Sequence, residues 1–162
     1  MHEITVKLGN RSYPVFIGQN TFDKLASALQ EQFPNARFAL ITNETLREIY
    51  NDQVRELSRT LDAIVHAIPD GERYKTVGTW SKILDTLLGN RLERSSVIIA
   101  FGGGVVGDIA GFAAASFLRG VALVQVPTSL LAMVDSSVGG KTGVNHDMGK
   151  NLVGAFHQPR MV

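Results

Sequence analysis

The sequence contains no cysteine, no long hydrophobic run and no excess of either charge. The lack of cysteine excludes disulfides and thiolate metal sites, and it is compatible with a reducing compartment. No segment approaches the roughly 20 apolar residues that a membrane-spanning helix requires. With 16 Lys and Arg against 15 Asp and Glu, the net charge of +1 gives no electrostatic reason to expect a nucleic acid or an anionic membrane as partner. We therefore expect a cytoplasmic protein that binds neither.

What the chain does contain is typical of one folded domain. Its 162 residues are 44% hydrophobic and 19% charged, which is enough to bury a sizeable core. Residues 1–8 alternate as in a strand and lack the apolar core of a signal peptide. Residues 155–162 carry no stop signal and end where an apolar stretch is beginning. We therefore expect this chain to be the front part of a longer protein.

The most informative segment joins a buried strand to a helix through glycines. Residues 97–101 form an apolar run, and residues 109–118 are rich in alanine and predict a tightly packed helix. Between them, Gly102, Gly104 and Gly107 fit the spacing G-x-G-x-x-G. Glycine permits a sharp turn and lets a phosphate approach the backbone, and a helix N-terminus offers free N–H groups. The segment therefore predicts a diphosphate-binding turn.

This turn is not the usual dinucleotide fingerprint. That motif opens a domain, and an acidic residue about 20 residues later holds a ribose. Here the turn follows residue 100, and the next strand, residues 121–126, leads into Gln125-Val126-Pro127-Thr128 with no acid. The alternative interpretation is that the glycines only permit a tight turn and close helix packing.

Hydrophobic periodicity predicts an α/β fold: a Rossmann-like, mostly parallel sheet with helices on both faces and an N-terminal β-hairpin. The hairpin is indicated by two alternating segments on either side of Gly9-Asn10-Arg11. Asn43 stands where it can cap the helix that follows it. The expected strands are residues 4–8, 13–17, 37–42, 63–68, 97–101 and 121–126, and the expected helices are residues 21–32, 44–61, 75–88, 109–118 and 129–134.

Polar loops follow three of these strands, at residues 42–44, 70–75 and 102–108. Because ligands bind at the carboxyl ends of parallel strands, we expect the three loops to converge on one ligand. Residues 135–146 form a long loop of small and polar residues, which is typical of a functional or a disordered segment. Its Gly139-Gly140-Lys141-Thr142 is similar to the end of a P-loop. However, Asp135 stands where the first glycine of that motif belongs, which argues against a nucleoside-triphosphate hydrolase.

Several runs of the chain are shared with a known enzyme family. They are Asp70-Gly71-Glu72 with Lys75, residues 102–108 continuing through Gly111-Phe112-Ala113-Ala114-Ala115, Arg119-Gly120, Pro127-Thr128-Ser129, residues 135–142, Asn145-His146 and Gly149-Lys150-Asn151. On these runs, which cover nearly the whole chain, the sequence resembles the N-terminal half of the 3-dehydroquinate synthase family of sugar-phosphate cyclases.

The resemblance implies that residues 1–162 are the NAD-binding N-terminal domain of a two-domain, homodimeric enzyme, with a helical C-terminal domain outside this chain. Such enzymes convert the sugar phosphate 3-deoxy-D-arabino-heptulosonate 7-phosphate to 3-dehydroquinate and phosphate in the shikimate pathway of aromatic amino acid biosynthesis. They use NAD to oxidise a ring hydroxyl transiently, and Zn²⁺ or Co²⁺ polarises that hydroxyl. One Glu and two His of the C-terminal domain hold the metal. The resemblance therefore implies no metal site and no activity for this chain alone.

The resemblance also assigns site residues. By position, Asn43 and Glu44 lie beside the adenosine ribose. The nicotinamide side is flanked by Asp70, Glu72 and Lys75, together with Gly71, Arg73 and Tyr74 of the same loop. The diphosphate is held by Gly103, Gly104, Val105 and Asp108, with Val106 and Gly107 between them. Thr128 and Ser129 also contact NAD, Ser129 standing where the family usually has a second Thr. Lys141, Lys150, Asn151 and Asp135 meet substrate or cofactor, and Arg119 reaches the substrate phosphate of a neighbouring subunit. Glu44 favours NAD over NADP, because its carboxylate would repel a 2′-phosphate.

Several alternatives stay open from the residues themselves. Arg119, Lys141 and Lys150 suit a doubly anionic phosphate, although Lys and Arg are usually solvated surface charges. The histidines show no metal-ligand spacing, so we expect His66 to be structural and His146 to be a loop contact. The alternative functions are another sugar-phosphate cyclase, a polyol oxidoreductase similar to glycerol dehydrogenase, and a non-catalytic nucleotide-binding module. The three cations argue against the polyol enzyme, because a neutral substrate needs none.

Overall fold

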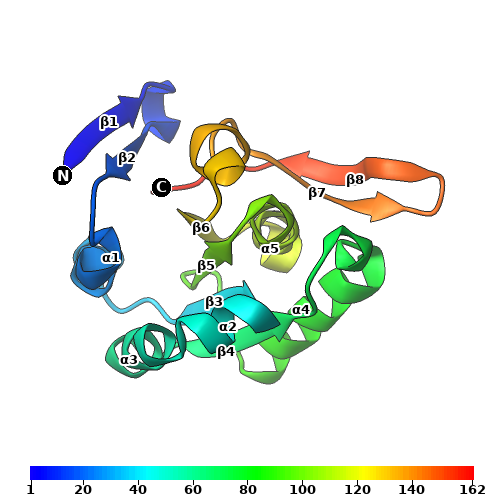
Figure 1. Cartoon of the computed structure of the whole chain (residues 1–162), viewed down its shortest axis with the longest axis horizontal. Helices are drawn as coiled ribbons and strands as arrows, with labels where there is room; N and C mark the ends of the chain where they lie inside the picture. The colour runs from blue at the N-terminus through cyan, green and yellow to red at the C-terminus, as the bar shows by residue number, and fades with distance from the viewer.

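A four-stranded parallel sheet in the order β4-β3-β5-β6 carries the fold in the computed structural model, which describes residues 1–162 (Figure 1). The two central strands are buried along almost their whole length, as their continuous apolar sequences predict. The expected parallel sheet is therefore confirmed. Its strands are β3 (Phe38–Asn43), β4 (Ile64–Ile68), β5 (Val97–Gly102) and β6 (Ala122–Pro127).

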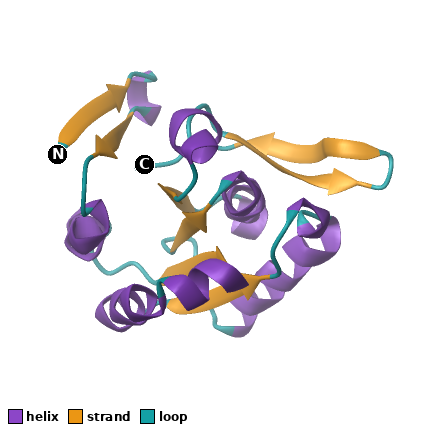
Figure 2. Cartoon of the chain, viewed as in Figure 1, coloured by secondary structure: helices purple, strands orange, loops and turns teal.

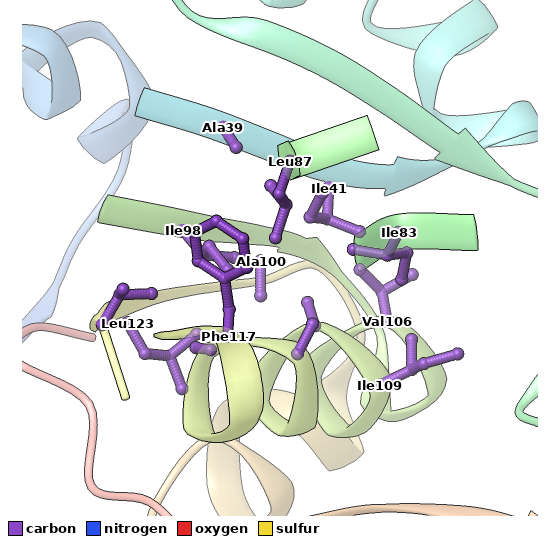
Figure 3. Packing of buried hydrophobic residues seen from close by; sticks show 14 of the residues in the cluster. Ala39, Ile41, Ile83, Leu87, Ile98, Ala100, Val106, Ile109, Phe117 and Leu123 are labelled. Carbon is purple, nitrogen blue, oxygen red and sulfur yellow. The ribbon is translucent and has the colours of Figure 1, made fainter. Parts of the chain in front are cut away.

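Helices cover both faces of this sheet, as expected (Figure 2). Successive side chains of β5 point to opposite faces, so Ile98 packs in one core cluster and Ile99 in the other. The first cluster lies against α4 (Val77–Gly89) and α5 (Gly104–Ser116), with Ile83, Leu87, Ile109 and Phe117 around Ala100 (Figure 3). The second lies against α1 (Leu25–Gln32) and α3 (Asn51–Leu61).

Two predicted helices begin or break differently from the expectation. The helix expected at residues 44–61 is α2 (Glu44–Ile49) followed by α3, because Tyr50 leaves helical geometry at ψ 32°. The Tyr50 ring packs edge-on against Phe101, with ring centroids 5.5 Å apart. The helix expected at residues 21–32 begins as a 3₁₀ turn, η2 (Thr21–Lys24), before α1. The Asn43 cap is confirmed, since Leu46 N donates to Asn43 Oδ1 at 2.9 Å.

The glycine segment is more helical than predicted. We expected a helix at residues 109–118, but β5 ends at Gly102 and α5 begins at Gly104, so the turn between them is Gly103 alone. Because glycine is a poor helix former, the sequence did not predict that the helix begins about a turn and a half before residue 109. Tertiary packing outweighs that cost here. A Cβ at Gly107 would lie 3.0 Å from Gln125 Oε1, so glycine lets α5 approach β6 closely.

Two hairpins flank the sheet. The N-terminal hairpin is confirmed, with β1 (His2–Val6) antiparallel to β2 (Tyr13–Ile17) across η1 (Gly9–Arg11). The expected loop at residues 135–146 is wrong in its second half, because β7 (Lys141–His146) pairs with β8 (Gly149–Phe156). Two glycines face each other in this pair, Gly143 and Gly154, and their low strand propensity concealed it. The remaining turns are η3 (Glu72–Tyr74), η4 (Phe117–Arg119) and a π-helical turn, η5 (Ala132–Ser136), which takes the place of the expected helix at residues 129–134.

The last residues of the chain join the N-terminal hairpin to the sheet. Met161 lies beside Val124 of β6, and Val162 exchanges backbone hydrogen bonds with β2, donating to Pro14 O at 3.0 Å and accepting from Phe16 N at 2.8 Å. None of the helices combines the length and the apolarity needed to cross a membrane.

A substitution at Gly111 tests how closely α5 and β7 pack. A Cβ at Gly111 would lie 2.5 Å from Thr142 Cγ2, and Thr142 is fixed because its Oγ1 donates to Ala155 O at 2.8 Å. Gly111→Ala should therefore lower the free energy of unfolding by about 1–3 kcal/mol in a denaturant titration, although alanine is the better helix former. The matched control is Gly78→Ala in α4, whose Cβ would meet nothing closer than 3.8 Å. It should gain up to about 1 kcal/mol, and a gain at both positions would contradict the packing.

Candidate functional site

The polar loops that follow the parallel strands meet at one edge of the sheet. The loop after β4 contacts the start of α2, where Asp70 Oδ2 accepts from Thr45 N at 3.1 Å. The segment after β6 contacts the glycine turn, where Thr128 N donates to Gly102 O at 3.0 Å. Lys75 of the loop after β4 reaches the glycine segment, with its Nζ 2.9 Å from Asp108 Oδ2, so the expected convergence of the three loops at the carboxyl ends of the strands is confirmed.

The glycines of the turn divide into two kinds. Gly102 serves packing, because a Cβ there would lie 2.5 Å from Val106 Cβ. Gly103 and Gly104 face hydroxyl groups instead, and Cβ atoms there would lie 3.3 Å from Ser129 Oγ and 3.2 Å from Ser136 Oγ. Gly102 and Gly107 thus fit the packing interpretation of the motif, whereas Gly103 and Gly104, with Ser129 and Ser136 beside them, form a polar segment at the start of α5 that we call the glycine mouth.

Free N–H groups lie at the start of α5. The first α-helical bond of α5 runs from Gly107 N to Gly103 O at 2.9 Å, so the N–H groups of Gly104, Val105 and Val106 precede the helical ladder. No side chain caps the helix at Gly103. These N–H groups and the positive end of the helix dipole suit an anion such as a diphosphate.

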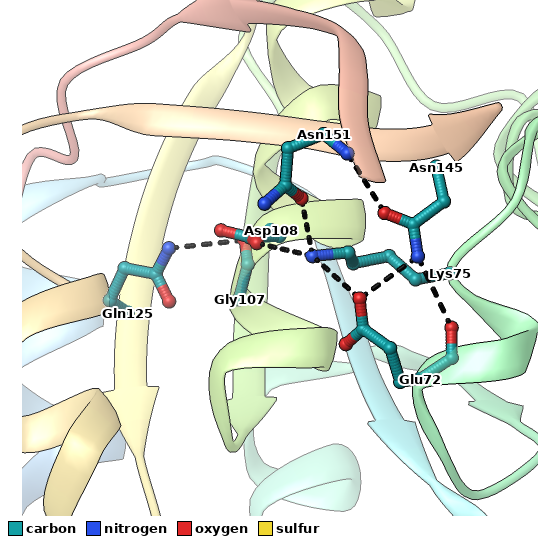
Figure 4. A network of polar contacts seen from close by, with 7 residues as sticks. All are labelled: Glu72, Lys75, Gly107, Asp108, Gln125, Asn145 and Asn151. Atoms are coloured by element: carbon teal, nitrogen blue, oxygen red, sulfur yellow. Dashed lines mark hydrogen bonds and ion pairs between the residues drawn. The ribbon is translucent and has the colours of Figure 1, made fainter. Parts of the chain in front are cut away.

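A buried lysine contacts Asp108 in the first part of α5 (Figure 4). Lys75 is 4% exposed, and its Nζ lies 2.9 Å from Asp108 Oδ2, 2.7 Å from Asn151 Oδ1 and 3.3 Å from Glu72 Oε1. Its three partners come from the η3 turn, from α5 and from the start of β8. A buried ammonium has three N–H donors and must use them, so this cation fixes three segments relative to one another.

The two carboxylates of this network differ in protonation behaviour. Burial alone would raise the pKa of Glu72, but the hydrogen bond from Asn145 and the charges of Lys75 and Lys150 outweigh burial and hold that pKa below its ordinary value. Burial raises the pKa of Asp108, and the hydrogen bond and charge of Lys75 only partly oppose it. The surroundings therefore favour the charged form of Glu72 and disfavour that of Asp108, each relative to its ordinary pKa.

Sequence reasoning missed two residues of this site. Asn145 of β7 donates through Nδ2 to Glu72 Oε1 at 2.9 Å, although only its place in a shared run had drawn attention to it. Gln125 is buried, and its Nε2 donates to Gly107 O at 3.3 Å. The sequence indicated only that the segment containing Gln125 lacks the acidic, ribose-binding residue of the usual dinucleotide motif. No spacing rule predicts either contact, because each joins elements far apart in the chain.

The other expected site residues are spread over this edge and beyond it. Glu44 is exposed in the first turn of α2, Arg73 lies over the Tyr74 ring at 4.8 Å, and Gly71 has a left-handed φ of 108°. Asp135 in η5 is exposed and is close enough to Asp108 to contribute to its raised pKa. Asn43 is occupied as the cap of α2.

The three expected cations do not gather within one chain. Lys150 lies near Glu72, at the tip of the β7–β8 hairpin, whereas Lys141 lies at its base opposite Phe156. Arg119 follows the far end of α5, and the 13 residues of that helix separate it from the glycine turn by roughly 20 Å. All three side chains are exposed.

The histidines make local contacts. His66 Nδ1 lies 2.7 Å from Thr86 Oγ1, and burial lowers its pKa. His146 Nδ1 accepts from Met148 N at 3.2 Å. No three His, Asp or Glu side chains come together as metal ligands anywhere in the structure. The residues of this chain therefore do not fit the divalent metal that the resemblance implies for the whole enzyme.

A separate apolar cavity of about 390 Å³ lies between β2, α1, β6 and η5. Phe16, Phe22, Leu130 and Met133 line it, and Lys24 is its one charged side chain. Such a lining does not suit the charged diphosphate of a dinucleotide, so the glycine mouth is the better candidate.

The sequence of this chain is similar to those of known enzymes. Residues 65–162 match the sequence family described as 3-dehydroquinate synthase N-terminal. A 3-dehydroquinate synthase of Geotalea uraniireducens is 52% identical over 164 residues, which cover 100% of this chain and 46% of the relative. The chain thus spans about half the length of the curated relatives that it matches.

Two solved structures share the fold over nearly the whole chain at 30% identity. One is a 2-deoxy-scyllo-inosose synthase complexed with carbaglucose-6-phosphate, NAD⁺ and Co²⁺, with a TM-score of 0.87 over 99% of this chain and 44% of that one. The other is a 2-epi-5-epi-valiolone synthase from Streptomyces hygroscopicus subsp. jinggangensis with NAD⁺ and Zn²⁺ bound. Its TM-score is 0.81 over 96% of this chain and 43% of that one.

Removing the buried cation tests the network. Lys75→Met keeps the apolar stem but leaves Asp108, Asn151 and Glu72 without their shared donor. We expect the free energy of unfolding to fall by about 3 kcal/mol, the low end for a broken buried pair, since Glu72 and Asp108 retain some contact with water. The control Lys82→Met, on the exposed face of α4, should stay within about 0.5 kcal/mol of the parent. Equal effects of both substitutions in a urea titration would contradict this role.

Proposed function

We propose, from the premise that the chain belongs to the 3-dehydroquinate synthase N-terminal family, that residues 1–162 are the NAD-binding part of a 3-dehydroquinate synthase. The observation that carries the proposal is the uncapped N-terminus of α5 at Gly103 and Gly104, with the Lys75 network joined to the same helix at Asp108. The whole enzyme would convert 3-deoxy-D-arabino-heptulosonate 7-phosphate to 3-dehydroquinate and phosphate.

The residues of the glycine mouth fit a dinucleotide. Side chains at Gly103 or Gly104 would fill the space next to Ser129 and Ser136, which supports a role in which the backbone itself meets the ligand. The N–H groups of Gly104, Val105 and Val106 would hold the diphosphate. Bound NAD would supply a reversible hydride acceptor for a ring hydroxyl of the substrate.

The flanking loops would hold the two ends of the cofactor. Asn43 and Glu44 at the start of α2 would border the adenosine ribose, where the exposed Glu44 carboxylate disfavours a 2′-phosphate. Asp70, Glu72 and Lys75 would border the nicotinamide side, with Thr128 and Ser129 across the mouth. The surroundings of Glu72 favour its charged form, which would help to keep the Lys75 ammonium in a fixed orientation.

The substrate side is less complete in this chain. Lys150 and Asn151 at the hairpin tip and Asp135 in η5 lie closest to the network and would meet the substrate. Lys141 and Arg119 lie apart from it, so Arg119 would serve the site of a neighbouring subunit in a homodimer. No step of the reaction is assigned to a metal held by this chain, because no set of ligands for one is present.

The nearest alternative is a different sugar-phosphate cyclase, since two solved cyclases share 30% identity with this chain. The 52% identity with a 3-dehydroquinate synthase favours dehydroquinate formation. A polyol oxidoreductase is disfavoured, because Lys150 beside the network suits an anionic substrate rather than a neutral one.

NAD binding tests the proposed site directly. Gly103 has φ −76° and ψ −171°, a conformation open to any residue, and Asp is a favourable N-cap. Gly103→Asp should therefore leave the melting temperature close to that of the parent, provided that Ser129 Oγ, 3.3 Å from the new Cβ, moves aside slightly, while its carboxylate occupies the anion position. In calorimetric titration we expect NAD affinity to fall by at least about tenfold. The control Gly78→Asp makes the same change at the start of α4 and should bind as the parent does. Unchanged binding by Gly103→Asp would contradict the assignment of the diphosphate.

Activity tests the proposal for the whole enzyme. The isolated chain should release no phosphate from 3-deoxy-D-arabino-heptulosonate 7-phosphate, even with NAD and Zn²⁺ or Co²⁺, because it gathers no metal ligands. Fused to the remaining residues of the Geotalea uraniireducens relative, it should restore phosphate release, and the same fusion carrying Gly103→Asp should not. Turnover by the isolated chain, or an inactive parent fusion that folds, would count against the proposal.

A further inference from the structure

Asn145 connects three segments of the site through three different atoms (Figure 4). Its backbone N donates to Lys75 O at 2.7 Å, its Nδ2 donates to Glu72 Oε1 at 2.9 Å, and its Oδ1 accepts from Asn151 N at 2.9 Å. The loop after β4 and the start of β8 are therefore both tied to one residue of β7.

The bond to Asn151 holds an unusual backbone. Asn151 has a left-handed φ of 57°, a conformation that asparagine tolerates better than most residues. In this conformation its side-chain Oδ1 accepts from Lys75 Nζ at 2.7 Å. Asn145 Oδ1 thus holds the peptide that directs Asn151 onto the buried cation.

The bond to Glu72 works on the second partner of the same cation. The Glu72 side chain is 40% exposed, so burial does not fix it, and its Oε1 lies 3.3 Å from Lys75 Nζ. Asn145 Nδ2 donates to that same oxygen. Two of the three partners of Lys75 are therefore held in place by Asn145, whose side chain itself makes no contact with the ammonium.

We infer that Asn145 is a positioning residue of the nucleotide site, one that holds the Glu72 carboxylate and the Asn151 amide on the Lys75 ammonium. The inference rests on the proposed function, because the site that Asn145 positions is the proposed NAD site.

The chemistry of the contact requires a carboxamide. The side chain must donate toward Glu72 and accept from Asn151 N at the same time, and an amide of this length does both. The reversed orientation of the amide would place two acceptors together at Glu72 and two donors together at Asn151. Aspartate has the same shape but only acceptors when ionised, so it would keep the bond from Asn151 and repel Glu72.

An exchange of donor and acceptor tests the inference. Asn145→Asp should weaken NAD binding about tenfold in calorimetry, because Glu72 swings away from Lys75. Adding Glu72→Gln should restore most of that affinity, since the amide introduced at position 72 can donate to the carboxylate introduced at position 145, and the net charge returns to that of the parent. The matched control is Asn10→Asp in the N-terminal hairpin turn, an exposed position far from the site, which should bind NAD as the parent does.

The pKa of Glu72, measured without NAD, tests the role of Asn145 separately from the proposed function. By NMR titration, Asn145→Asp should raise the pKa of Glu72, because it removes a hydrogen bond that lowers that pKa and adds a like charge. A lower melting temperature with unchanged NAD affinity, or a double variant that recovers nothing, would overturn the inference. If the parent chain itself binds no NAD, the proposed binding role of this chain falls. An unchanged Glu72 pKa in Asn145→Asp would then still overturn the inference, and a raised one would uphold the contact.

Discussion

The arrangement of the site depends on one buried cation. The Lys75 ammonium is removed from water and is compensated only by groups from three separate segments, namely Glu72, Asp108 and Asn151. A buried charge without partners is costly, so the loop after β4, helix α5 and the β7–β8 hairpin are stabilised together rather than one at a time. The open N-terminus of α5 is thereby held at a fixed place among these loops.

Close packing of α5 makes this arrangement possible. Gly107 and Gly111 bring one side of the helix against Gln125 of β6 and Thr142 of β7, at distances that a Cβ would not allow without movement. The hairpin reaches the network because Gly143 and Gly154 pass each other closely in its centre. Glycines at the start of the same helix serve a different purpose in the proposed function, since side chains at Gly103 and Gly104 would fill the space next to Ser129 and Ser136. One helix would thus divide its glycines between packing and binding.

Local sequence patterns predicted the elements that depend on local interactions. The sheet, the covering helices, the N-terminal hairpin and the Asn43 cap follow from apolar runs, helical periodicity and a capping residue, and the structure has all of them. The start of α5 and the β7–β8 hairpin did not follow, because tertiary contacts compensate there for glycines that local propensity counts against helix and strand. The roles of Asn145 and Gln125 could not be predicted either, because they too depend on tertiary contacts: their partners lie 73 and 18 residues away along the chain. Lys75 and Asp108 were expected at the site only through the family resemblance.

In the proposed function, the mouth of α5, held by the Lys75 network, receives the cofactor. Titrating the ¹⁵N-labelled chain with NAD and following its amide chemical shifts tests this most directly. We expect the largest changes on Gly103, Gly104, Val105 and Val106, with smaller ones at residues 70–75 and 128–129. Changes confined to the apolar cavity around Phe16, Phe22 and Met133, with the α5 mouth unaffected, would contradict it.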